Sequence, residues 1–286
     1  MNPYQLNNEI ARRQSGVIRT KASFIREAQY SLNLMQNRVI YYCILVCQQD
    51  RKGKLGRVEI PVNLFKEICG LKGKSANHHL SSITESMLQT VIQYWVDDPK
   101  VGPKLIQTHW LKSVEYILNQ GIIVVELNER LQPYFMGSPY VETEFFYLTK
   151  YKSQYSQRLS EIFKSFGNKK IVDFYIDDLR RRLGLSDDMY PNYSDFKRRV
   201  LVPAIEGVNR YTNMHITLHD ERRGARNKIV RLFFMLESVE TPKLIERVQN
   251  GEFLTELSPE ETEILKQLYA RRDDSQNIEQ MTLENA

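Results

Sequence analysis

The chain carries one short pattern twice, and this internal repeat restricts its fold more than any other feature. Residues 62–71 align without gaps to residues 176–185. Each block begins with a β-branched residue, continues with an Asn or Asp that we expect to cap a short amphipathic helix, and stops at a glycine. Those glycines, Gly70 and Gly184, can adopt the left-handed conformation that ends a helix without steric cost. A short helix followed by a tight turn is the first half of a helix-turn-helix.

Further helices are predicted on both sides of each block. Asn33 and Gln36 can form a capping box, which predicts a long helix before the first block. Before the second block, apolar and aromatic residues recur three and four positions apart, as expected for one buried helix face. These residues are Tyr151, Tyr155, Leu159, Ile162, Phe163 and Phe166. Another helix is predicted after each block, at about residues 75–94 and about residues 194–209.

Each half then closes with two strands joined by a polar or glycine-containing turn. The predicted strands are residues 105–116 and 122–127 in the first half, and residues 214–219 and 229–236 in the second. Helix, short helix, second helix and hairpin is the order of a winged helix. The sequence therefore predicts an α+β fold with two tandem winged-helix domains and an acidic, partly helical C-terminal tail.

Breakers and caps suggest where these parts begin and end. We expect an N-terminal arm (1–22), a first winged-helix domain (23–145), a second winged-helix domain (146–237) and an acidic tail (238–286). The boundary between the two winged helices follows Gly137 and Pro139. In the tail, Ser258 and Glu261 can form a capping box that opens a helix to about residue 270.

The charge is distributed unevenly between the body and the tail. The whole chain has a formal net charge of +5, but residues 237–286 contain 12 acidic and 5 basic residues. A basic body joined to an acidic segment favours a nucleic-acid-binding body. The longest apolar run, residues 39–47, is far shorter than the roughly 20 residues that span a bilayer, and the N-terminus lacks a signal-peptide pattern. We therefore expect a cytoplasmic protein with no membrane contact.

The second half carries the stronger candidate surface for DNA. In a helix-turn-helix the second helix enters the major groove, where the planar fork of an arginine can bind guanine or a phosphate. A helical wheel turns Phe196, Val200, Ala204, Gly207 and Val208 inward. The expected DNA contacts are Lys197, Arg198, Arg199 and Asn209 on the helix, and Arg222, Arg223, Arg226 and Lys228 around the turn of the final hairpin. Pro203 is expected to kink the helix one turn past the arginines.

The corresponding region of the first half is less basic. Its expected DNA contacts are Lys72, Lys74, Ser75, His78 and Ser82, which we expect to position the protein on the duplex rather than to read bases. Either charged segment of the second half, taken alone, could be only a solvated surface. Because both segments fall on the DNA-facing elements of one predicted fold, DNA binding is the favoured interpretation.

Catalytic and metal-binding patterns find no support in the sequence. Cys43 and Cys47 lie one helical turn apart in an apolar stretch, which is typical of core residues. His78 and His79 are adjacent, with no further Cys or His at ligand spacing. The glycines at positions 53, 56, 70 and 73 lack the Walker spacing. We expect no metal, no cofactor and no enzymatic activity.

Three segments resemble a known family. Residues 22–40, 155–166 and 196–209 look like the best-marked segments of plasmid replication initiators with two winged helices, and the likeness runs from about residue 20 to 237. Two positions depart from that family: Ser160 stands where it often has an aromatic residue, and Gly207 where it often has Glu.

The resemblance implies a function. It implies a protein that binds directly repeated double-stranded sites (iterons) in a plasmid origin as a monomer, helps to open the duplex, and recruits the host replication initiator and the replicative helicase. It also implies repression of its own promoter as a dimer. Most sequence-specific contacts would come from the second domain, here at Lys197, Arg198 and Arg199, and the first domain would support DNA contacts and dimerisation.

Two other functions use the same observations. A winged-helix transcriptional regulator would share the fold, because fold alone does not determine function. A nicking or nucleotide-hydrolysing replication enzyme is disfavoured, because its motifs are missing from the sequence.

Overall fold

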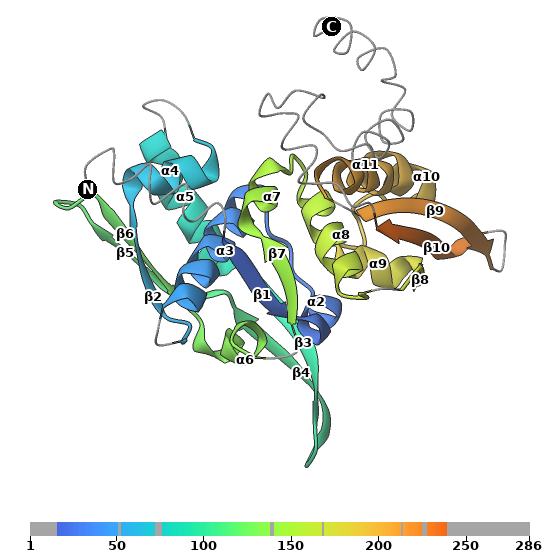
Figure 1. The fold of residues 1–286 in the computed structure, drawn as a ribbon, viewed down its shortest axis with the longest axis horizontal. Coiled ribbons are helices and arrows are strands. Elements are labelled where there is room, and N and C mark those ends of the chain that lie inside the picture. The colour runs from blue at the N-terminus through green and yellow to red at the C-terminus, as the bar shows by residue number, and fades with distance from the viewer. Residues whose placement is uncertain are drawn as a thin grey trace, which may run out of the picture.

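The computed structural model describes residues 16–50, 53–71, 76–137, 140–167, 169–212, 214–224 and 228–238 (Figure 1). The predicted tail helix and residues 1–15 of the predicted N-terminal arm lie outside these residues. The two domain boundaries predicted at 22/23 and 145/146 stay predictions. Among the described residues, no helix is both long and apolar enough to cross a membrane.

The first half contains a long buried helix, a winged helix and two additional strand pairs. Its elements in chain order are β1 (Val17–Lys21), α2 (Ala22–Glu27), α3 (Leu34–Gln49), β2 (Arg57–Pro61), α4 (Val62–Cys69), α5 (Ala76–Gln89), β3 (Val91–Asp98), β4 (Gly102–His109), β5 (Leu111–Ile117), β6 (Ile122–Leu127), a short 3₁₀ helix (Glu129–Leu131), α6 (Gln132–Phe135), β7 (Tyr140–Glu144) and α7 (Phe145–Lys150).

The second half repeats the winged helix, and its described residues form no additional strand pair. Its elements are α8 (Gln154–Lys164), β8 (Ile171–Tyr175), α9 (Ile176–Arg182), α10 (Tyr193–Phe196), a π-helical turn (Lys197–Leu201), α11 (Val202–Tyr211), β9 (Met214–Arg223) and β10 (Ile229–Ser238). Figure 1 shows α4 and α5 toward one end of the molecule and α9, α10 and α11 toward the other, with α2, α3, α7 and α8 between them.

The two halves have the same sheet topology, which confirms the predicted repeat. One sheet has the strand order β2-β6-β5 and the other the order β8-β10-β9. Both are antiparallel, with Ile60 opposite Ile123 in the first sheet and Phe174 opposite Leu232 in the second. A short helix follows the first strand of each sheet directly, and each helix is followed by a glycine with positive φ, +71° at Gly70 and +75° at Gly184. In each half, the helix-turn-helix therefore begins directly after the first strand of the sheet.

Several predicted boundaries are wrong. The two short helices begin at Val62 and Ile176, so Pro61 and Tyr175 occupy the N-cap positions and no side chain caps either helix. The expected caps at Asn63 and Asp177 therefore lie inside the first turn, because strands β2 and β8 run straight into the helices. Asn33, by contrast, caps α3 in a capping box with Gln36, as predicted.

The predicted helix at residues 75–94 and the strand at residues 105–116 are also wrong in extent. Helix α5 ends at Gln89, and residues 91–94 belong to β3. Val91, Ile92, Tyr94 and Trp95 are β-branched or aromatic residues, which favour a strand. The predicted single strand is two strands, β4 and β5, separated at Trp110. Sequence periodicity missed the β3–β4 hairpin because its first strand directly continues a helical pattern.

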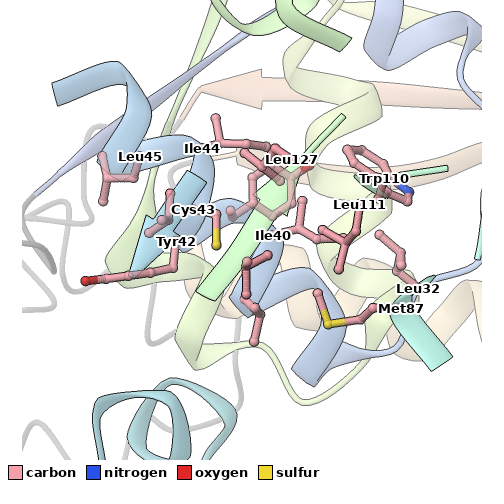
Figure 2. Close-up of a cluster of buried hydrophobic side chains, with 14 of the residues drawn as sticks. Leu32, Ile40, Tyr42, Cys43, Ile44, Leu45, Met87, Trp110, Leu111 and Leu127 are labelled. Carbon is pink, nitrogen blue, oxygen red and sulfur yellow. The ribbon is translucent and has the colours of Figure 1, made fainter. Parts of the chain in front are cut away.

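Two hydrophobic cores hold the fold together. The first gathers around α3, where Ile40, Cys43 and Ile44 are buried, and Figure 2 shows Trp110 and Leu127 in the same cluster. All three cysteines are buried and free, as expected of core residues. The second core gathers α8, α9, α11 and the β8-β10-β9 sheet. Helix α2 contributes to both cores, because Phe24 lies in the first and Ile25 in the second.

Candidate nucleic-acid interface

The predicted recognition helix is one helix with a π-helical turn in its middle. Residues 193–211 run through α10, the π turn and α11. At the π turn the Val202 N–H donates to the Lys197 carbonyl, five residues back. Pro203, the next residue, has no N–H to donate to the carbonyl of Arg199. The helix therefore has a widened turn over the arginines, directly before Pro203, and the kink expected after them stays a prediction.

The buried face of this helix agrees with the helical wheel. Phe196, Val200, Ala204 and Val208 are buried in the second core, and Leu201 joins them. Gly207 packs against α8, where a Cβ at that position would lie 2.3 Å from the Ser156 hydroxyl oxygen. A glutamate at position 207 would therefore not fit this packing. The opposite face of the helix is left at the surface.

Arg198 and Arg199 lie on that exposed face. Their side chains are 71% and 59% exposed, and both guanidinium groups pair with Asp195, at 3.0 Å and 3.7 Å. Exposed ion pairs of this kind contribute only about 0.2–1 kcal/mol. A phosphate or a guanine edge can therefore replace Asp195 at little cost. Val202 and Glu206 are exposed on the same face, as the wheel predicted.

The wing is the hairpin of β9 and β10. Arg222, Arg223 and Lys228 are exposed along it, whereas Arg226 lies outside the described residues. The Arg222 guanidinium lies 4.6 Å from the centre of the Phe233 ring, which supports the side chain at the surface. Two register shifts interrupt the pairing of β9 with β10, one near Val230 and one near His219. Such irregularities increase the local twist of a hairpin.

Glu221 joins the helix to the wing. Its carboxylate accepts hydrogen bonds from the Tyr193 hydroxyl at 2.6 Å and from the Lys197 ammonium at 2.5 Å. Burial alone would raise the pKa of Glu221, but the hydrogen bonds from Lys197 and Tyr193 lower that pKa below its ordinary value. These contacts place the residues next to Arg198 beside the end of β9 that leads into the turn of the wing, so the helix and the wing form one surface. Figure 1 shows the hairpin extending from the end of the molecule that carries α10 and α11.

Two of the expected DNA contacts have partners within the protein. Lys197 pairs with Glu221 and so connects the helix with the wing, and its role as a DNA contact stays a prediction. Asn209, which we expected to face outward, is half-buried: its amide donates to the Ile216 carbonyl at 2.9 Å and accepts from the Ile216 N–H at 2.7 Å. The helical wheel failed at Asn209 because strand β9 passes beside the end of α11, and a wheel considers one helix alone.

The corresponding surface of the first half carries no lysine or arginine where it is described. Ser82 is exposed on α5, together with Glu85 and Gln89. The remaining expected contacts, Lys72, Lys74 and Ser75, lie outside the described residues, and only the backbone of His78 is described. The whole of α5 contains no lysine or arginine. The DNA-contact role of these residues stays a prediction.

A run of arginines on α9 has roles that sequence reasoning did not assign. Arg180 donates to the Tyr190 carbonyl at 2.8 Å and lies over the Phe196 ring, so it holds the loop before the recognition helix. Arg181 is exposed beside Asp178. The consecutive arginines at 180–182 were visible in the sequence, but only the fold shows which of them reach the loop and which reach the surface.

Among the residues that the structure describes, no three His, Cys, Asp or Glu side chains come together in a way that could hold a metal ion. His215 and His219 lie on β9 without such a group around them.

Family models match both halves of the chain. Residues 17–164 match the model of the initiator replication protein WH1 domain, and residues 175–235 match that of the initiator Rep protein WH2 domain. This chain belongs to the Rep replication initiator family. The WH1 match extends through α8, beyond the boundary predicted at residue 145. The first half, through α7, is hereafter the WH1 unit, and the second half, from α8 onward, is the WH2 unit, because the buried residues of α8 lie in the second core.

Solved structures agree with this family at the level of the fold. The chain is similar to the Pi initiator protein in its crystal structure with iteron DNA, with a TM-score of 0.58 and 18% sequence identity. That match covers 80% of this chain and 99% of the other. A crystal structure of the WH1 domain of MSBI1.176, a replication protein isolated from a multiple sclerosis patient, matches with 9% identity and a TM-score of 0.29. It covers 35% of this chain and 76% of that domain, and the score is too low to support any argument.

Proposed function

We propose that this initiator binds repeated sites, iterons, in the double-stranded DNA of a plasmid origin and so begins replication. The observation that carries the proposal is the single surface formed by Arg198, Arg199 and the wing of the WH2 unit. The helix would lie in the major groove, and the wing would follow the phosphate backbone. The crystal structure of the similar Pi initiator protein contains iteron DNA, which supports the same kind of ligand here.

The later steps are part of the same proposal. Binding of several copies to adjacent iterons would help to open the duplex, and the complex would recruit the host replication initiator and the replicative helicase. As a dimer, the protein would repress its own promoter, and the WH1 unit would support the dimer and position the protein on DNA. The protein would act in the cytoplasm without a cofactor and without enzymatic activity. Incubation with supercoiled DNA, ATP and Mg²⁺ should therefore produce neither nicks nor phosphate.

A footprint tests the central claim. The purified protein is incubated with the DNA that flanks its gene, and protection is mapped at increasing protein concentration. We expect protection of directly repeated segments about two helical turns apart beside an AT-rich stretch. A double variant, Arg198→Ala with Arg199→Ala, should lose this protection. Arg19→Ala is the matched control, because Arg19 is also exposed and also pairs with one carboxylate, Glu142, at 3.1 Å.

The outcomes separate the candidate functions. A single protected operator without repeats would favour a winged-helix transcriptional regulator. No specific protection by the wild-type protein would contradict the proposal.

A further inference from the structure

A buried arginine joins the WH1 and WH2 units. Arg158 lies on α8 and its side chain is 6% exposed. Its guanidinium donates to the carbonyls of Ile25 at 2.8 Å and Ala28 at 2.7 Å, both at the C-terminal end of α2. It also donates to the carbonyl of Arg182 at 3.0 Å, the last residue of α9. One side chain thus satisfies carbonyl groups at the ends of a WH1 helix and a WH2 helix, which have no partners within those helices.

The Arg158 guanidinium also packs on an aromatic ring of the WH1 unit. Its central carbon lies 4.6 Å from the centre of the Tyr30 ring, and it pairs with Glu161 at 3.3 Å. The Tyr30 hydroxyl donates to Glu161 at 3.3 Å, and the ring packs edge-on against Trp110, 5.0 Å between centroids. Trp110 belongs to the first core. Arg158 is therefore connected through Tyr30 to the centre of the WH1 unit.

The turn of the second helix-turn-helix packs directly against this point. A Cβ at Gly184 would lie 2.3 Å from the Tyr30 carbonyl oxygen and 3.0 Å from the Ser31 Cα. Gly184 thus provides both the left-handed end of α9 and the space for the chain of the WH1 unit. Its counterpart Gly70 meets only the tip of Arg38, at 3.3 Å. The close approach is a property of the interface between units and not of the repeat.

We propose that Arg158 is the positioning residue that sets the angle between helices α5 and α11, so that the initiator measures the spacing between the two parts of its DNA site. The proposal rests on the proposed function, in which both units contact one duplex. A rotation of one unit against the other would pull the guanidinium away from the carbonyls of Ile25 and Ala28 and from the Tyr30 ring, and would leave buried donors of Arg158 without acceptors. Buried donors and charges strongly resist such a loss.

A rigid protein of this kind cannot follow a change of spacing in DNA. One inserted base pair moves the second half of a site by about 3.4 Å and rotates it by roughly 35°, because B-DNA has 10–10.5 base pairs per turn of 34–36 Å. A flexible connection would tolerate this displacement. The response to inserted base pairs therefore separates a positioning role of Arg158 from a purely stabilising one.

The first measurement needs no DNA. Spin labels are placed on Ser82→Cys in α5 and Glu206→Cys in α11, both exposed positions, while the three native cysteines are buried. In the otherwise wild-type protein we expect one narrow distance distribution by double electron–electron resonance. Arg158→Met with Glu161→Gln removes both buried charges and should broaden the distribution at least twofold. An unchanged width would overturn the proposal.

The matched control removes an ion pair of the same type that lies within the WH1 unit. Arg57 and Glu115 pair at 2.7 Å on exposed strands β2 and β5. Arg57→Met with Glu115→Gln should leave the distance distribution unchanged. If the Arg158 double variant does not fold by circular dichroism, Arg158→Lys replaces it: a lysine keeps the charge beside Glu161 but cannot reach the carbonyls of both units. Arg158→Lys should also broaden the distribution, and a wild-type width would again overturn the proposal.

The second measurement uses the DNA site defined by the footprint. One base pair is inserted between the parts protected by the WH1 and WH2 units, and the dissociation constant is measured by titration. We expect the insertion to weaken wild-type binding at least tenfold and binding of the Arg158 variant less than threefold. An equal loss in both proteins would refute the positioning role. If the wild-type protein binds no specific site at all, the proposed function fails, and the spin-label distances still decide whether Arg158 fixes the two units.

Discussion

The WH1 and WH2 units have the same sheet and the same helix-turn-helix, yet they present different surfaces. In the WH1 unit, α5 contains no lysine or arginine, and the charged side chains of its sheet pair with one another, as Arg57 does with Glu115 and Lys112 with Glu126. In the WH2 unit, Arg198 and Arg199 stand on the recognition helix, with Arg222 and Arg223 on the wing. The fold is therefore shared, and the surface side chains distinguish the two units.

The two units also differ in what has been added to them. The WH1 unit carries the β3–β4 hairpin and the β1–β7 pair. The part of the WH2 unit that the structure describes has neither, but its recognition helix contains the π turn next to Pro203. The two units thus share the winged-helix sheet and its buried positions, and they differ in their additional strands and in the charges on their surfaces.

The largest expected effect tests whether the buried positions are equivalent. Phe65 in α4 and Leu179 in α9 occupy the same place in the repeat, and both are fully buried. We expect Phe65→Ala to lower the free energy of unfolding by about 3–5 kcal/mol, and Leu179→Ala by about 2–5 kcal/mol. Urea denaturation measures both, with the exposed Ile171→Ala as control. If either core substitution cost no more than Ile171→Ala, the equivalence of the two blocks would be wrong.

A smaller effect tests whether the two recognition helices differ in function. Arg198→Ala should weaken binding to the cognate repeat by about 1–3 kcal/mol and relax its sequence preference. Ser82→Ala, at an exposed position of α5, should change the affinity by less than about 0.5 kcal/mol, because a positioning contact reads no base. Titrations on repeats with single base changes measure both. Equal losses from the two substitutions would mean that the units share recognition equally.

The wing should act on all DNA alike. Because Arg222 is placed to contact phosphates, Arg222→Ala should weaken binding to specific and unrelated duplexes similarly. It should also lower the slope of log affinity against log salt by about one. Affinities at four salt concentrations measure this slope. A loss confined to the cognate repeat would assign Arg222 to base recognition instead.

The smallest effect concerns the contact between helix and wing. The pKa of Glu221 is lower in the folded protein than its ordinary value of 4.5. Its carboxylate therefore stabilises the fold at a pH above 4.5, and this contribution is lost as the pH falls through the pKa of the folded state. The difference in melting temperature between the wild-type protein and Glu221→Gln should therefore shrink between pH 6 and pH 3. Glu206→Gln, on the exposed face of α11, serves as control. A difference that stayed constant over this range would contradict the assigned role of Glu221.

Much of the fold could be predicted from local patterns. The gapless repeat, the glycines that end both short helices and the Asn33 capping box all depend on residues close together in the chain. The β3–β4 hairpin could not be predicted in the same way, because its first strand follows α5 with one residue between them. No glycine or proline between Gln89 and Val91 marks the point where the helix ends and the strand begins.

The candidate site was predicted less completely than the fold. Arg198, Arg199, Arg222, Arg223 and Lys228 lie at the surface as expected. Lys197 and Asn209 have partners that a helical wheel does not include, because Glu221 and Ile216 on strand β9 bind them. No pattern around Arg158 distinguished it from the exposed arginines of the chain.

The sequence alone determined that two copies of one helix-turn-helix follow each other, because helix ends, turns and apolar periodicity depend on neighbouring residues. Only the tertiary structure decided which cations lie at the surface and which hold the protein together. Lys197 and Arg158 are chemically suited to either use, and the choice depends on the carboxylates and carbonyls that distant elements bring within hydrogen-bonding distance of them.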